Sequence, residues 1–224
     1  MTAGVHGKPR VPAKLGKLLS TGVVYPIMQA GMPGVADVEL AAAVSRSGGI
    51  GTLGLQDVSV WEQSLRRMKA LACGKPVNAN LLLPYTRRKH IDGLLREQIP
   101  LVTLFWGEAS KLTREFHQHG IFVFQQVGSV DEADRALDAG VDAIIAQGIE
   151  AGGHIRGTQR LAELLPRIAE HASSTPVFAA GGVYSADDVR RVVALGASGV
   201  STGTMWIPMK PPGYTEVMPP VVPI

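Results

Sequence analysis

The stretch PVFAAGGVYSADDVRRVVALGASGVSTGT, residues 176–204, carries the repeating unit that decides the fold. It begins with a short apolar run that ends in a pair of glycines, as expected for a buried strand followed by a tight turn. Ser185 then precedes Asp188 by three residues, a capping pattern that predicts the start of a helix, and Gly196 predicts its end. Because a second apolar run follows, the stretch predicts a strand, a helix and a parallel strand.

Apolar runs of this kind recur along the whole chain, and a helix-like stretch follows each one. After the run at 121–128, for example, Ser129 and Glu132 repeat the capping pattern. The run ends recur at a mean of roughly 25 residues, close to one βα unit of a closed barrel. The runs lie at residues 25–31, 49–54, 76–83, 101–107, 121–128, 142–148, 176–182 and 198–204.

Eight such units predict an α/β fold, a (β/α)8 TIM barrel. A doubly wound sheet has the same alternation of strands and helices, and periodicity alone does not separate the two. We expect an N-terminal arm at 1–21, with a short helix around 13–20, a barrel domain at 22–206, and a Pro-rich irregular tail at 207–224. Prolines in the tail prevent a helix, so the barrel is expected to lack its final helix and the C-terminal helical additions. The outer face of the last strand would then be exposed and would favour self-association.

The composition excludes several classes of protein. Hydrophobic residues make up 46% of the chain and charged residues 18%, so a sizeable core is expected. The net charge of +3 is too small and too scattered to indicate a nucleic-acid partner. No apolar run approaches the length of a membrane span, and no metal-ligand spacing is present. The single Cys73 suits a reducing compartment, so we expect a cytoplasmic protein.

In a (β/α)8 barrel the functional residues lie at the carboxyl ends of the strands. The seventh and eighth runs end in Gly181-Gly182 and in Gly203-Thr204. Loops at these two positions commonly bind phosphate through bare backbone N–H groups, so we predict an anion site there. Two ordinary glycine turns are the alternative interpretation.

Side-chain amides end several of the runs. Asn78 and Asn80 are two residues apart and share one side of the third strand. Gln147 closes the sixth run, and only one of Gln125 and Gln126 can point into the barrel from the fifth. Such a mouth suits a ring system with several carbonyls and nitrogens, although asparagines also satisfy loop backbone. In the first run, the small residues around Gly31 would let a flat ring lie against the backbone.

His154 is the candidate catalytic residue. It follows the sixth run in the stretch EAGGH, next to Gly153, where a plain turn would not need a titratable ring. Imidazole can abstract a proton or stabilise an anion near neutral pH. The other histidines are interpreted as structural or exposed, and Glu150 as a residue that orients the loop or is solvated. The basic run at 87–89 is interpreted as a solvated helix start, with contact to an anionic substrate as the alternative.

The motifs AQGIEAGGH (146–154), PVFAAGGV (176–183) and GVSTGT (199–204) resemble those of the nitronate monooxygenases, formerly called 2-nitropropane dioxygenases. The opening PIMQAGMPGVADVELAAAVSRSGGIGTLG (26–54) resembles the first two units of the same family. The resemblance covers residues 22–206. Flavin-dependent enoyl-ACP reductases share these motifs.

The resemblance implies a flavoprotein with FMN at the barrel mouth and His154 as the catalytic residue. It implies an oxidoreductase that oxidises alkyl nitronates or nitroalkanes with O2. The alternatives are an enoyl-ACP reductase-like enzyme using NAD(P)H, a barrel that binds phosphate without redox chemistry, and a non-catalytic barrel. The expected FMN-binding residues are Ala30, Gly31, Met32, Asn78, Asn80, Gln125, Gln147, Gly153, Gly181, Gly182, Gly203 and Thr204.

Overall fold

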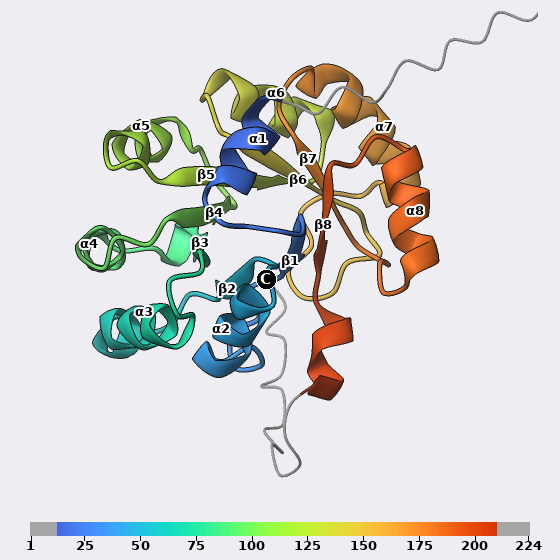
Figure 1. The fold of residues 1–224 in the computed structure, drawn as a ribbon. Coiled ribbons are helices and arrows are strands. Elements are labelled where there is room, and N and C mark those ends of the chain that lie inside the picture. Colours follow the sequence, from blue (N-terminus) through green and yellow to red (C-terminus); the bar gives the residue numbers. More distant parts are fainter. Residues whose placement is uncertain (1–12, 210–224) are drawn as a thin grey trace, which may run out of the picture.

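Within residues 13–209, which the computed structural model describes, eight parallel strands form the centre of the protein (Figure 1). Residues 1–12 and 210–224, and with them most of the predicted tail, lie outside the described residues. The sheet order is β1-β8-β7-β6-β5-β4-β3-β2. The strands are β1 (Ile27–Gln29), β2 (Gly51–Leu53), β3 (Val77–Leu82), β4 (Leu101–Phe105), β5 (Phe122–Val127), β6 (Ala143–Gln147), β7 (Val177–Ala180) and β8 (Gly199–Thr202).

The sheet closes on itself between β1 and β2. The Gln29 amide donates to the Ile50 carbonyl at 2.9 Å, and the Ile50 amide donates to the Ile27 carbonyl at 2.8 Å. One step further, the Gln29 side-chain oxygen Oε1 accepts from the Thr52 amide at 3.0 Å and extends the ladder beyond the end of β1. Because β1 also pairs with β8, the strands form a barrel, which confirms the predicted (β/α)8 fold and excludes a doubly wound sheet.

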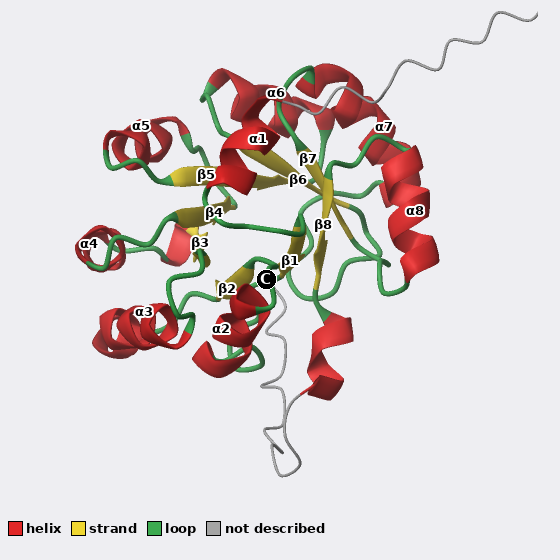
Figure 2. Ribbon diagram, in the orientation of Figure 1, coloured by secondary structure: helices red, strands yellow, loops and turns green. Residues whose placement is uncertain are grey.

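Helices surround the barrel, one after each of the strands β1 to β7, as Figures 1 and 2 show. Both predicted N-caps are confirmed: the Ser129 hydroxyl accepts from the Glu132 amide, and the Ser185 hydroxyl accepts from the Asp188 amide, each at 3.2 Å. These helices are α2 (Val38–Arg46), α3 (Val58–Leu71), α4 (Arg88–Arg96), α5 (Ser110–Gln118), α6 (Val130–Asp138), α7 (Leu161–Ala172) and α8 (Ala186–Ala194).

The hydrophobic core has two parts. The larger part lies between the outer face of the sheet and the helices. The smaller part fills the inside of the barrel, where the rings of Phe124 and Phe178 meet edge to face at 5.4 Å. Bulky side chains therefore fill the barrel below its carboxyl end, as expected for a packed core rather than a pore.

Helix α1 (Ala13–Ser20) lies across the barrel in Figure 1 and packs against its interior. Leu15 and Leu18 join the interior part of the core, and Leu18 is fully buried. The Lys17 ammonium donates to Asp142 Oδ1 at 2.8 Å, which ties α1 to the start of β6. The helix thus covers the amino end of the barrel and leaves the carboxyl end as the open mouth.

The outer face of β8 differs from the expectation. Val200 points outward but is only 2% exposed, because it packs in the same core cluster as Val192 and Ala197. The prediction of an exposed strand face is therefore wrong at this residue. A 3-10 helix, η2 (Thr204–Met209), follows β8, and no α-helix follows it before residue 210, where the description stops. Among residues 13–209 there is no helix with the length and hydropathy of a membrane span.

The buried carboxylate of Asp142 generates a prediction about stability. Burial alone would raise the pKa of Asp142, but donors from Lys17, the Val123 amide and His117 outweigh it and hold the pKa below its ordinary value. This stabilisation is fully present above the unfolded-state pKa of about 3.9. It is lost as the pH falls through the lower folded-state pKa.

Asp142→Asn should therefore lower the free energy of unfolding at pH 7 by about 1–3 kcal/mol, because the Lys17 ammonium loses its anionic partner and an NH2 group replaces one acceptor oxygen. The deficit relative to wild type should shrink below about pH 4. Urea denaturation at both pH values measures it. Asp138→Asn, on an exposed aspartate of α6, is the control and should change stability by less than about 0.5 kcal/mol. A deficit that stays constant with pH would contradict the assignment.

Candidate active site at the barrel mouth

The carboxyl ends of the eight strands, with the loops that follow them, form the mouth of the barrel. Strand register determines which side chains point into it, because paired residues in a parallel sheet share a face. Asn80 pairs with Thr103, and Gln147 pairs with Ala180. Ala180 also pairs with Ser201, so these residues form inward-facing rows near the mouth.

Asn78 and Asn80 lie on the inner face, as expected, but at different depths. Asn78 is fully buried, and its Nδ2 donates to Thr52 Oγ1 at 3.1 Å and to Thr103 Oγ1 at 2.8 Å. Asn80 lies two residues closer to the mouth. A Cβ at Gly31 would lie 2.8 Å from the Asn80 side chain, so only glycine permits this approach.

The Oδ1 atoms of both asparagines are buried, and neither has a hydrogen-bond partner among the residues that the structure describes. A buried acceptor without a donor costs free energy, so such atoms are usually satisfied by a ligand or water. These two oxygens are therefore available to a ligand that carries N–H groups.

The structure does not bring Gln125 to the mouth. Gln125 pairs with Leu104 and Ile144, which belong to the outer core cluster, so its side chain lies on the helix-facing side of β5. Gln126 pairs with Ile145, an interior residue, and takes the inward position. The sequence showed that only one of the two could face inward, but a continuous apolar run does not reveal which.

Gln147 anchors the loop between β6 and α7. Its Nε2 donates to the His154 carbonyl at 2.8 Å, and its Oε1 accepts from the Arg156 amide at 3.1 Å. Gly153, immediately before His154, has a positive φ of 73°, which glycine adopts readily. The His154 side chain is exposed, and its ring meets the Trp106 ring edge to face at 4.9 Å. No feature of the sequence singled out Trp106, because the contact joins two distant loops.

Glu150 orients the same loop rather than facing a ligand. Its Oε2 accepts from the Leu161 amide at the start of α7 at 2.9 Å, and its Oε1 lies 3.5 Å from Arg160 Nε. The loop also lies against the turn after β7, since a Cβ at Gly181 would be 2.9 Å from the Ala151 amide nitrogen. The predicted histidine loop and the predicted phosphate loop are therefore in direct contact.

A third anchor joins the loop to the start of α6. Arg156 Nε donates to Glu132 Oε1 at 2.5 Å, while Glu132 Oε2 accepts from the Gly128 amide at 2.8 Å. The backbones of Gly128 and Gly157 meet so closely that a Cβ on Gly157 would lie 2.0 Å from the Gly128 carbonyl oxygen. Glycine at both positions is required for this contact.

The residues expected around a phosphate lie on neighbouring strands. Gly181 and Gly182 follow β7 with positive φ values of 118° and 64°. Gly203 follows β8, and a Cβ there would be 3.3 Å from Met32 Sδ, so the loop after β1 lies against it. Thr204 is exposed at the start of η2. The Ala30 amide donates to the Thr202 carbonyl at 2.8 Å, which fixes the loop after β1 beside β8.

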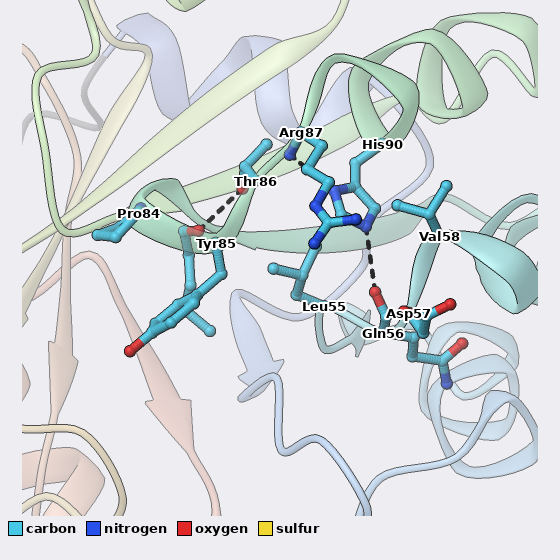
Figure 3. Close-up of a pocket in the computed structure, with 10 residues that line it drawn as sticks. Leu55, Gln56, Asp57, Val58, Pro84, Tyr85, Thr86, Arg87 and His90 are labelled. Atoms are coloured by element: carbon cyan, nitrogen blue, oxygen red, sulfur yellow. Dashed lines mark hydrogen bonds between the residues drawn. The ribbon is translucent and has the colours of Figure 1, made fainter.

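A pocket of about 410 Å3 lies between the loops that follow β2 and β3, and Figure 3 shows its lining. His90 is buried there: its Nδ1 accepts from the Arg87 amide at 2.9 Å, and its Nε2 lies 3.2 Å from the Gln56 carbonyl. Burial lowers the pKa of His90, so the neutral ring that donates from Nε2 links the two loops. The pocket is lined by Leu55, Gln56, Asp57, Val58, Leu82, Pro84, Tyr85, Thr86, Arg87 and His90.

A closed parallel barrel with polar side chains and glycine turns at its carboxyl end is the architecture of the (β/α)8-barrel enzymes. Comparison with known proteins assigns the chain within this class. The model of the nitronate monooxygenase family matches residues 17–104 and 85–217, and the chain belongs to this family.

Two curated proteins are similar to this chain in sequence. The (3aS,4S,5R,7aS)-5-hydroxy-7a-methyl-1-oxo-octahydro-1H-indene-4-carboxyl-CoA dehydrogenase of Rhodococcus jostii is 32% identical over 83% of this chain. This chain spans about half the length of that relative, 53%. A probable nitronate monooxygenase of Staphylococcus aureus is 29% identical over 92% of this chain and 70% of its own.

Solved structures share the fold. FabK from Thermotoga maritima matches with a TM-score of 0.79 and 30% identity over 88% of this chain and 63% of its own. The nitroalkane oxidase from Streptomyces ansochromogenes matches with a TM-score of 0.77 and 26% identity over 84% and 67% of the two chains.

The two hydrogen bonds of Gln147 generate a prediction about the histidine loop. Gln147→Leu keeps a side chain of similar size but removes both bonds, so hydrogen exchange at the Arg156 amide should accelerate about tenfold or more. The Leu161 amide, which Glu150 holds, should keep its wild-type rate. In the matched variant Glu150→Leu, which removes the acceptor of the Leu161 amide, we expect the largest change at Leu161 instead. Equal acceleration at both amides in both variants would mean that the loop opens as one unit.

Proposed function

We propose that this protein is a flavin-dependent oxidoreductase that holds FMN at the barrel mouth and oxidises alkyl nitronates with O2. Membership of the nitronate monooxygenase family supports the reaction class. The position of His154 carries the proposal: an exposed imidazole lies on a loop whose backbone Gln147 holds at two points beside the strand ends.

The mouth suits the ring system of FMN. The Oδ1 atom of Asn78 or of Asn80 can accept from the one N–H of the oxidised ring, at N3, and both oxygens lack a donor within residues 13–209. Glycine at position 31 lets the loop after β1 lie directly against Asn80, so a ring held by Asn80 would also lie near this loop. When bound, FMN would supply the oxidation of the substrate and the transfer of electrons to O2.

The turns after β7 and β8 suit the phosphate group. Gly181 and Gly182 expose backbone without side chains, and Gly203 adds a third such position on the neighbouring strand. Backbone N–H groups can approach an anion closely only where no Cβ intervenes. Thr204 adds a hydroxyl at the same edge.

His154 would act on the substrate. Its imidazole can take a proton from the α-carbon of a neutral nitroalkane, or stabilise the negative charge of a nitronate when protonated. The arginines of the loop are paired, Arg156 with Glu132 and Arg160 with Glu150. The loop therefore offers the imidazole to the substrate, while its arginines hold its shape.

Reduction of a thioester substrate with NAD(P)H, as in the enoyl-ACP reductases that the motifs resemble, is the second candidate. The pocket between the loops after β2 and β3 favours it, because Arg87 lines a space that could take a phosphate of a large carrier. The name of the Rhodococcus relative, a carboxyl-CoA dehydrogenase, supports the same substrate class.

Two measurements on the purified full chain test the proposal. A visible flavin spectrum should be present, and its absence would favour a barrel without redox chemistry. Under anaerobic conditions, propane-2-nitronate should bleach the flavin faster than NADH or NADPH. Faster reduction by a nicotinamide would reject the nitronate reaction and favour the enoyl-ACP reductase-like reaction, which reduces the C=C bond of an enoyl thioester.

His154→Ala should retain wild-type flavin content but slow flavin reduction by nitronate or nitroalkane about 10²- to 10⁴-fold, the usual contribution of a positioned acid–base group. A larger loss with neutral nitroalkane than with preformed nitronate would identify His154 as a base. Stopped-flow absorbance measures both. His119→Ala, which changes an exposed histidine at the end of α5, should behave like wild type. Wild-type rates in His154→Ala would refute the role.

A further inference from the structure

Trp106 has a backbone conformation that bulky residues rarely adopt. It lies directly after β4 with a φ of +55°, followed by Gly107 with a φ of +134°. Outside glycine and a few small polar residues, a positive φ marks a turn under strain. Such strain persists only where surrounding contacts hold the residue in place, and it gathers at functional sites. The contacts of the indole therefore indicate what the strained turn achieves.

The indole reaches across the mouth to the histidine loop. Its ring lies 5.3 Å from the Phe105 ring and 4.9 Å from the His154 ring, and the latter pair is nearly perpendicular at 84°. The strands that carry these loops, β4 and β6, are not neighbours, because β5 lies between them. The contact therefore passes over the end of β5 and joins two loops whose strands do not pair with each other.

The His154 ring has few other constraints. Gln147 holds the backbone around it through the His154 carbonyl and the Arg156 amide. For the side chain, within the part of the chain that the structure describes, the only interaction shown is the edge-to-face contact with Trp106. Edge-to-face packing restricts the orientation of both rings. Gln147 therefore fixes where the residue is, and Trp106 fixes which way the imidazole points.

We propose that Trp106 is a positioning residue that orients the His154 imidazole over the barrel mouth. The inference rests on the proposed function, because it assumes that His154 acts on the substrate. The strained turn after β4 brings the large ring to this point, since a residue in ordinary strand conformation would continue along β4. Within residues 13–209 the buried Trp106 Nε1 makes no hydrogen bond, so the contacts of the indole with these residues are the ring contacts with Phe105 and His154.

Two substitutions at Trp106 distinguish the effect of the indole ring from the effect of the strained backbone. Trp106→Gly removes the ring and also relieves the strain, because glycine adopts positive φ freely, so the variant should fold. Trp106→Phe keeps an aromatic ring. Relative to wild type, Trp106→Gly should slow flavin reduction about 10- to 100-fold, the effect of a misplaced catalytic group, with unchanged flavin content and little change in KM. Trp106→Phe should stay within about threefold of wild type.

Proton NMR of the histidine rings gives a readout that does not depend on activity. The indole ring current should shift the His154 ring resonances, which are identified by their disappearance in His154→Ala. These resonances should move toward ordinary values in Trp106→Gly and only partly in Trp106→Phe. Unchanged resonances in Trp106→Gly would overturn the inference directly.

The kinetic results distinguish failure of the inference from failure of the proposed function. If His154→Ala slows flavin reduction but Trp106→Gly does not, the positioning role of Trp106 is overturned and the proposed function stands. If His154→Ala itself reacts like wild type, the proposed function fails, and the positioning role fails with it. Thermal unfolding of Trp106→Gly at or above the wild-type midpoint would exclude misfolding as the cause of a slow rate.

Discussion

The closure of the sheet between β1 and β2 is the constraint on which the site depends. β1 is only three residues long, and the Gln29 side chain extends its ladder by accepting from the Thr52 amide. Without the pairing between β1 and β2, the eight strand ends would lie in a row along one edge of an open sheet. With it they form a ring, so the first loop, around Gly31, faces the third strand at Asn80. Groups separated by fifty residues of sequence then share one mouth.

Inside the ring, the alternation of side chains determines which residues reach the mouth. Aromatic and aliphatic residues fill the amino half of the barrel, and α1 covers that end with Leu18. On β2, β3 and β4, polar residues take the inward positions above them, beginning with the Thr52–Asn78–Thr103 hydrogen bonds. Side chains alternate along a strand, so a shift of one residue would turn its inward side chains outward. In the observed register of β5, Gln126 faces inward and Gln125 faces the helices.

Local signals predicted the strands and caps well, because glycine turns and the Ser129 and Ser185 caps depend on neighbouring residues. Features that depend on contacts between residues far apart in the sequence could not be predicted from local patterns. The apolar fifth run carries no alternation from which the direction of Gln125 could be read. Burial of Val200 depends on packing with α8, and the position of Trp106 beside His154 depends on a contact across β5.

The loop that carries His154 has an anchored backbone but an exposed imidazole. Its backbone is held by Gln147, by Glu150 at the start of α7, and by the ion pair of Arg156 with Glu132 at α6. Each anchor joins the loop to the barrel or to an adjoining helix, so the loop backbone is held at three places. The imidazole, by contrast, is exposed, and the one interaction shown for it among residues 13–209 is with the Trp106 ring from another loop. The backbone of His154 and its ring therefore have separate contacts, the first with Gln147 and the second with Trp106 from the loop after β4.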